Sequence, residues 1–143
     1  MPMRDPDTAK LHLDGHSICL CKDGDIITDD SRGIAPMMKL IAAGTDLRGY
    51  SAADLIVGKA AAMLFVKAGI VSVFGKVMSE AALHYLEQHG IPAEYDTLTE
   101  KIINRRGTDI CPMEKTVAAI DDAEQGYAAL KQKIKELKQS SQS

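Results

Sequence analysis

Cys111 is the residue of this sequence best suited to nucleophilic chemistry. It directly precedes Pro112, and proline is favoured in the first turn of a helix, so the thiol is expected at a helix N-terminus. The helix dipole and the nearby Arg105, Arg106 and Lys115 would favour the thiolate, which is the reactive form. A thiol is also a small apolar filler. The sequence therefore predicts either a reactive cysteine or a structural one.

Lys59 is the second candidate, because it stands in an apolar run, residues 51–69, that predicts a single helix with almost no polar face. Gly58 beside it would destabilise a helix interior, which suggests a close backbone approach at this point. A buried ammonium group needs a partner. Lys59 is expected to reach solvent, to pair with Asp54 or Glu114, or to contact an anion or carbonyl group of a ligand.

Two further groups of residues could bind an anion. Ser79 and Glu80 are expected to open a helix, where free backbone N–H groups attract negative charge, although serine is equally an ordinary N-cap. Asn104, Arg105 and Arg106 could hold a phosphate or carboxylate, or could be solvated before a glycine turn. The predicted catalytic residues are Cys111 and Lys59, and the predicted ligand-binding residues are Ser79, Glu80, Asn104, Arg105 and Glu114.

No metal or other cofactor is expected. His84 and Glu87 lie one helical turn apart, but they supply only two ligands, and the sequence "CPME" supplies one soft ligand at Cys111. A catalytic zinc site needs about three protein ligands.

The segments that must position these residues alternate between strands and helices. Residues 16–22 and 25–29 predict an antiparallel hairpin, and residues 34–44 a short helix. Ser51 and Asp54 have capping-box spacing, so the helix of residues 51–69 is expected to begin at Ser51 and to end at Gly69.

A strand, a helix and a strand follow at residues 70–78, 79–90 and 91–98, and the chain is helical from Pro112, with a break near Asp121 and Asp122. So short a strand–helix–strand unit implies a parallel pair. The order predicts an α/β fold, a three-layer α/β/α sandwich whose mixed sheet begins with an antiparallel hairpin.

Length and composition favour one domain, predicted over residues 1–138, with a disordered tail at 139–143. The net charge of −3 gives no reason to expect a nucleic-acid polymer as partner. The start "MPMRDPDTAK" lacks the apolar core of a signal peptide, and no stretch is apolar enough for a membrane span. A cytoplasmic protein with free thiols, and no membrane partner, is expected.

The C-terminal helix carries an apolar stripe at spacings of three and four, formed by Tyr127, Leu130, Ile134 and Leu137. This stripe is either the inner face of a packing helix or the surface of a homodimer.

Several motifs occur in a fixed order along the chain: "VGKAAAML", "MSEAALHYL" with "HGI", a tyrosine in the next strand, "IINRRG" and "CPME". Through these motifs the sequence resembles a family of small prokaryotic proteins catalogued only as a domain of unknown function. The resemblance extends from Leu11 to Asp122. That family is similar in structure to the cytidine deaminases. The resemblance implies a cytidine-deaminase-like fold.

Deaminases carry His-x-Glu or Cys-x-Glu at the start of one central helix and Pro-Cys-x-x-Cys at the start of the next, because three ligands hold the zinc ion and the glutamate transfers protons. Here those places hold Gly58 and Lys59 in the first helix, and residues 79–82 in the second. The resemblance therefore implies a member of this fold without zinc.

The expected function is the binding of a small ligand, a nucleotide or nucleobase derivative, in the cleft where the metal site would lie. One alternative is an enzyme that uses Cys111 as a nucleophile, assisted by Lys59 or Glu114. Another is a non-catalytic oligomeric or interaction protein in which Cys111 is structural.

Overall fold

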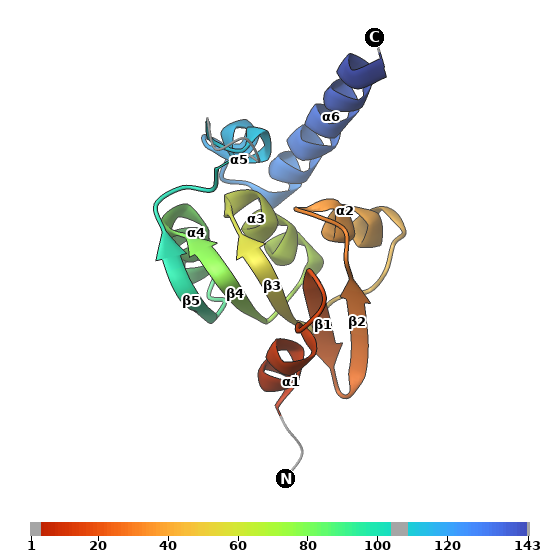
Figure 1. Cartoon of the computed structure of the whole chain (residues 1–143), viewed down its shortest axis with the longest axis vertical. Coiled ribbons are helices and arrows are strands. Elements are labelled where there is room, and N and C mark those ends of the chain that lie inside the picture. Colours follow the sequence, from red (N-terminus) through yellow and green to blue (C-terminus); the bar gives the residue numbers. More distant parts are fainter. Residues whose placement is uncertain (1–3, 104–108, 143) are drawn as a thin grey trace.

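The computed structural model describes residues 4–103 and 109–142, which form one five-stranded sheet with helices on both faces (Figure 1). The strands are β1 (Ile18–Lys22), β2 (Asp25–Asp29), β3 (Ser51–Val57), β4 (Ser72–Ser79) and β5 (Ala93–Thr99). Their order in the sheet is β2-β1-β3-β4-β5, with β1 antiparallel to both of its neighbours and β3, β4 and β5 parallel. The predicted mixed sheet that begins with a hairpin is confirmed.

The β1–β2 hairpin follows its sequence signal closely. Asp23 and Gly24 form the turn with φ values of 49° and 85°, a left-handed conformation that suits a two-residue hairpin turn. Side chains then alternate along β1: Leu20 enters the main core, whereas Cys19 and Cys21 lie in the smaller core on the other face. Strand β1 is therefore a central strand covered on both faces.

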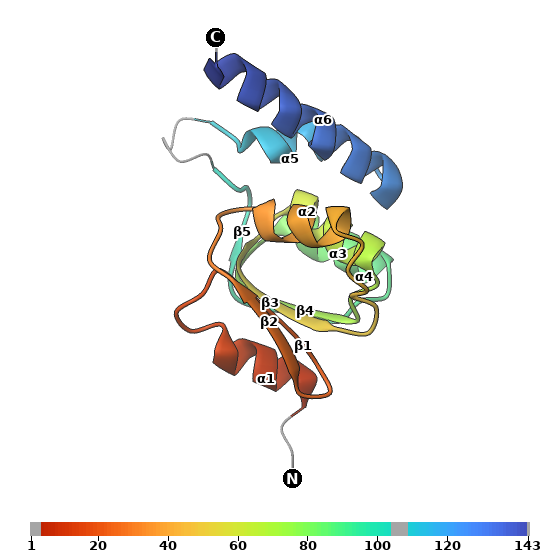
Figure 2. The ribbon, with the colours of Figure 1, turned by 90° about the vertical axis from the view of Figure 1, so that its right-hand side faces the viewer.

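Figure 2 shows how the helices are layered on the sheet. The helices are α1 (Asp5–His12), α2 (Ala35–Ala42), α3 (Lys59–Ala68), α4 (Glu80–Gln88), α5 (Pro112–Val117) and α6 (Ala123–Gln142). Helix α1 covers one face, α2, α3 and α4 cover the other, and α5 and α6 lie outside them as a further layer. The three predicted layers are present, and α5 and α6 add a fourth.

The outer layer is held by burial of apolar side chains against α3. Leu130 of α6 and Val117 of α5 are fully buried in the main core. Gly126 permits the close approach of α6, because a Cβ atom there would overlap the Met63 thioether of α3. The first half of the stripe predicted on this helix is therefore packing surface, whereas Leu137 near its end is 42% exposed.

The predicted helix over residues 51–69 is wrong in its first half. Residues 51–57 form β3, and the helix begins only at Lys59. Ser51 and Asp54 are buried within the strand and do not cap a helix. The prediction that Gly69 ends the helix is confirmed, since it has the left-handed φ of 81° and its N–H bonds back to the last turn.

The physical reason for the error is the position of β3. It lies between β1 and β4, and its first four residues are buried, with Ala52 and Ala53 pointing into the cores on opposite faces. A strand buried on both faces shows no alternation of apolar and polar residues, and by composition alone it resembles a buried helix.

The remaining predicted elements agree with the structure. Strands β4 and β5 are parallel and joined by α4, and α5 and α6 are separated at Ala118–Asp122, as the break near Asp121 and Asp122 indicated. The domain boundary at residue 138 stays a prediction. Across the described ranges, none of the helices combines the length and apolar character needed to cross a bilayer.

Candidate functional site

The N-termini of α3 and α4 lie next to each other at the carboxyl ends of two neighbouring strands of the sheet. Their preceding strands, β3 and β4, are parallel neighbours in which Val57 pairs with Met78. Each strand leads almost directly into its helix, α3 beginning at Lys59 and α4 at Glu80. In open α/β sheets, the carboxyl ends of parallel strands are where ligands bind.

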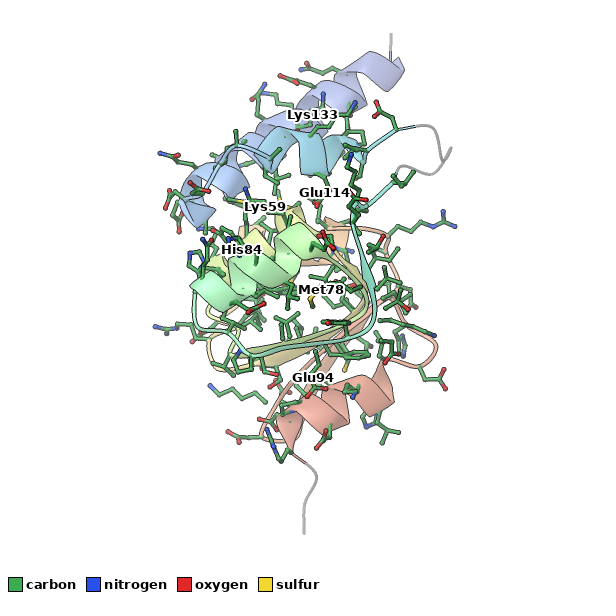
Figure 3. The ribbon with its side chains drawn as sticks, turned by 90° about the vertical axis from the view of Figure 1, so that its left-hand side faces the viewer. Lys59, Met78, His84, Glu94, Glu114 and Lys133 are labelled. Atoms are coloured by element: carbon green, nitrogen blue, oxygen red, sulfur yellow. The ribbon has the colours of Figure 1, made fainter. Side chains whose placement is uncertain are left out.

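The carboxylate of Glu114 caps α3 from a distant part of the chain (Figure 3). It accepts hydrogen bonds from the backbone N–H groups of Lys59, at 2.7 Å, and of Ala60, at 2.9 Å. Gly58, the N-cap residue, has no side chain with which to do this, and a Cβ atom there would lie 2.5 Å from the Glu114 carboxyl carbon. Gly58 therefore leaves the space that Glu114 occupies.

The environment of Glu114 pulls its ionisation in two directions. Burial raises the pKa of this carboxyl group, while the two N–H donors and the Lys59 ammonium act to lower it, and burial has the larger effect. The carboxyl group of Glu114 is thus an acid whose pKa is above its ordinary value, held at a helix N-terminus.

Ser79 caps α4 in the ordinary way. Its Oγ accepts a hydrogen bond from the Ala82 N–H at 3.0 Å, and the residue is almost fully buried. Glu80, the next residue and also a predicted ligand-binding residue, is exposed in the first turn of α4. The hydroxyl proton of Ser79 is still able to donate to a ligand.

Lys59 is the first residue of α3 and does not lie in the middle of a helix as predicted. Its side chain extends from α3 toward the outer layer formed by α5 and α6. Its Nζ donates to the Ala118 carbonyl oxygen at 3.1 Å and lies 6.0 Å from the centre of the Tyr85 ring. Of its two predicted partners, Glu114 is bound through the Lys59 backbone N–H, whereas Asp54 lies inside β3. The ammonium group keeps hydrogen-bond donors for a ligand.

Tyr85 was not predicted from the sequence, although it completes the site. This residue of α4 is buried, and its hydroxyl donates to the Asp121 carbonyl oxygen at 2.7 Å. Burial raises the pKa of the phenol, with smaller contributions from Asp122 and Asp121. Its spacing from Ala82 and Leu86 on the inner face of α4 was the available signal, but that spacing indicates only burial.

A cavity of about 330 Å³ lies among these groups. Three predicted residues line it together, namely Lys59, Ser79 and Glu114. The remaining lining residues are Ala81, His84, Tyr85 and Gln88 of α4, Glu100, Lys101 and Ile102 after β5, and Ile110, Ala118 and Asp121 around α5. The cavity thus combines two basic side chains, three acidic ones, a histidine and a buried tyrosine with apolar walls.

Comparison with known proteins places the chain in a family. Residues 8–134 match the family model TM1506, a domain of unknown function (DUF1893). The chain belongs to the DUF1893 family. Its fold is also similar to the crystal structure of a DUF1893 family protein (TM1506) from Thermotoga maritima, with a TM-score of 0.82, 25% identity, and coverage of 93% of this chain and 92% of that one. No curated protein matches.

The predicted membership of a small family of unknown function is therefore confirmed, and with it the extent of the resemblance over most of the chain.

In this DUF1893 protein Cys111 lies beside the cavity wall without lining it. It is half-buried at the N-cap of α5, where its N–H donates to Ile102 at 2.9 Å and its carbonyl accepts from Lys115 at 3.1 Å. These hydrogen bonds involve only the backbone atoms of Cys111. The role of its thiol, reactive or structural, stays a prediction. The predicted residues Asn104 and Arg105 lie outside the described residues.

The described side chains offer no site of deaminase type for a metal ion. Among them, no group of three or more His, Cys, Asp or Glu side chains is arranged to hold a metal ion. The donor set at the two helix N-termini consists of a carboxylate, a hydroxyl and an ammonium group, from Glu114, Ser79 and Lys59. This set does not fit the three soft or imidazole ligands of a deaminase-type zinc ion.

Proposed function

We propose that this DUF1893 protein is a zinc-free, deaminase-like protein that binds a small ligand, a nucleotide or nucleobase derivative, in the cavity between α3, α4 and α5. The observation that carries the proposal is the convergence of Lys59, Ser79 and Glu114 on one cavity of about 330 Å³ at the paired helix N-termini. That volume is within the lower range of small-molecule sites.

The deaminase-like relation is supported by topology. The strand order is β2-β1-β3-β4-β5, with β1 antiparallel to its neighbours and β3, β4 and β5 parallel, and two helices begin directly after β3 and β4. The resemblance assigns the metal ligands of deaminases to the starts of those two helices. Here Glu114 binds the N–H groups at the first start, and Ser79 caps the second. The cleft keeps its place in the fold while its polar groups differ.

The chemistry of the cavity suits a polar, ring-shaped ligand. The Lys59 ammonium and the Ser79 hydroxyl can donate hydrogen bonds, while His84 and Gln88 can both donate and accept. Ile102 and Ile110 supply an apolar wall for a ring. The nucleobase class itself rests on analogy of fold, and the mixed donors and acceptors are consistent with the edge of a base.

Binding can be tested by calorimetry with cytidine monophosphate, adenosine monophosphate, cytosine and adenine. At least one is expected to bind and to raise the melting temperature, because a ligand of the folded state stabilises it by mass action. Lys59→Gln should weaken binding by roughly tenfold through loss of a charged donor. Lys39→Gln, which changes an exposed lysine of α2, is the matched control and should bind as the wild type does. A panel without binding, or equal loss in both variants, would contradict the proposal.

A further inference from the structure

The face of the sheet that carries α1 is only partly covered. Helix α1 lies opposite the other helices (Figure 2), and beside it runs a groove of about 710 Å³. Leu55 of β3 and the largely buried Phe74 of β4 line this groove, with Leu13, the C-cap residue of α1, on its wall. Leu55 is 39% exposed, which leaves an apolar side chain open to solvent beside a helix.

The outer surface of α1 forms a ridge next to this groove. Ala9 and Leu13 turn toward the sheet and are buried, whereas Leu11 is 60% exposed. Asp7 precedes Leu11 by four residues, so the two side chains share the outer face of the helix, and the exposed Arg4 is the N-cap residue just before it. We call this surface, Arg4, Asp7 and Leu11, the α1 crest.

The charges of the crest and of the groove are complementary. In the groove, Lys76 and Asp96 make no side-chain hydrogen bond or ion pair with any residue that the structure describes, and the same is true of Arg32 at its rim. The crest offers one carboxylate, at Asp7, and one guanidinium group, at Arg4. Each sign on the crest therefore has a counterpart of opposite sign in the groove.

The shape of this face suits a second copy of the same chain. In a two-fold symmetric dimer the same patch of both copies meets itself, so the patch must be self-complementary. A ridge beside a groove meets this condition: when two such faces are turned toward each other, each ridge enters the opposite groove. An exposed leucine on the ridge would then cover an exposed leucine in the groove.

We propose that a second copy of this chain docks on the α1 face, with the α1 crest of each copy lying in the groove of the other. Leu11 of one copy packs over Leu55 of its partner, and Asp7 and Arg4 lie among the free charges of the groove. The interface is on the opposite side of the sheet from the cavity lined by Lys59 and Glu114, so it is independent of the proposed ligand.

Sedimentation velocity of the full chain over a range of concentrations tests this interface. The wild type is expected to dimerise, and Leu11→Lys should raise the dimer dissociation constant by roughly a hundredfold, because the lost contact occurs twice across the axis. Leu55→Glu should act similarly. The double variant Leu11→Lys with Leu55→Glu should regain most of the dimer, since the new charges meet across the interface.

Leu137→Lys is the matched control, because Leu137 is likewise an exposed leucine on a helix, here near the end of α6. It should dimerise as the wild type does, and circular dichroism should show every variant folded. A wild type that is monomeric at all concentrations would overturn the proposal. So would a Leu11→Lys dimer of unchanged stability, or a dimer lost only with Leu137→Lys.

Discussion

Gly58 and Glu114 depend on each other at the scale of single residues. Gly58 has φ −99° and ψ 179°, an extended conformation open to any residue, so Gly58→Ala carries no backbone penalty. The new Cβ would nevertheless occupy the space of the Glu114 carboxylate and displace it from the Lys59 and Ala60 N–H groups. We expect the free energy of unfolding, measured in urea, to fall by about 2 kcal/mol.

A double-mutant cycle separates this contact from other effects of the alanine. Glu114→Ala also removes the cap, so in its background Gly58→Ala should cost less than in the wild type, by roughly 1 kcal/mol or more. Additive costs of the two mutations would show that Gly58 is needed for a reason other than Glu114.

Asp54 is a buried carboxyl group without a cationic partner among the described residues. Burial raises its pKa from 3.8 to about 7, although the N–H groups of Ile56 and Leu55 act in the opposite direction. Between these two values the unfolded chain releases the proton while the folded protein keeps it. Stability from this group is therefore complete below pH 3.8 and is lost as the pH rises through 7, by about 4 kcal/mol in total.

Asp54→Asn cannot ionise, so its stability relative to the wild type should increase steadily between pH 4.5 and pH 8. Urea unfolding of both proteins at several pH values measures this difference, in which the titration of all other groups cancels. A difference that does not change with pH would show that Asp54 is not the buried acid described here.

Some of the residue roles in the site were predictable from the sequence, and there is a physical reason why the others were not. Ser79 was expected as a cap because its acceptor role involves Ala82, three residues away, and so leaves a local pattern. The capping role of Glu114 leaves none, since its partner Lys59 is 55 residues distant. Tyr85 is similar, because its hydroxyl bonds to a backbone carbonyl, which no sequence pattern marks.

At the scale of elements, the connection between α5 and α6 is fastened to the helices beneath it. Tyr85 of α4 binds the Asp121 carbonyl, and Lys59 of α3 binds the Ala118 carbonyl. Tyr85→Phe should destabilise the protein by about 1 kcal/mol and should increase amide hydrogen exchange in residues 118–122, because one of these two attachments is lost.

Tyr50→Phe is the control for this experiment. It also removes a tyrosine hydroxyl that donates to an acceptor, the carboxylate of Asp25, but at the other edge of the sheet. Exchange at residues 118–122 should stay at the wild-type rate in Tyr50→Phe. Equal acceleration in both variants would mean that the connection responds to global stability alone.

Elements with a local signal, such as a cap, a turn or one solvated face, were predictable, and β3, which has no such signal, was not. Helix α4 has a cap, an apolar inner face and a glycine just beyond its end, and its position was predicted from these signals. Strand β3 has none of these signals, and its first four residues, 51–54, are all buried. Its partners β1 and β4 decide its structure, and their pairing is a long-range property.

At the scale of the whole molecule, the two proposed surfaces are separated by the sheet. The cavity belongs to the side that carries α3, α4 and α5, and the groove to the side that carries α1. A dimer formed through the α1 crest would thus leave both cavities open to solvent and facing away from the two-fold axis. Ligand binding and dimerisation are consequently expected to be thermodynamically independent.

The distant cap on α3 also bears on how the protein is made. A ribosome adding about 5–20 residues per second would place Glu114 in the chain roughly 3–11 seconds after Lys59, given the 55 residues between them. During that interval the start of α3 has no cap, because Gly58 supplies none. The nascent sheet and α3 must therefore exist without this cap for that time, and the site becomes complete only when α5 has left the ribosome.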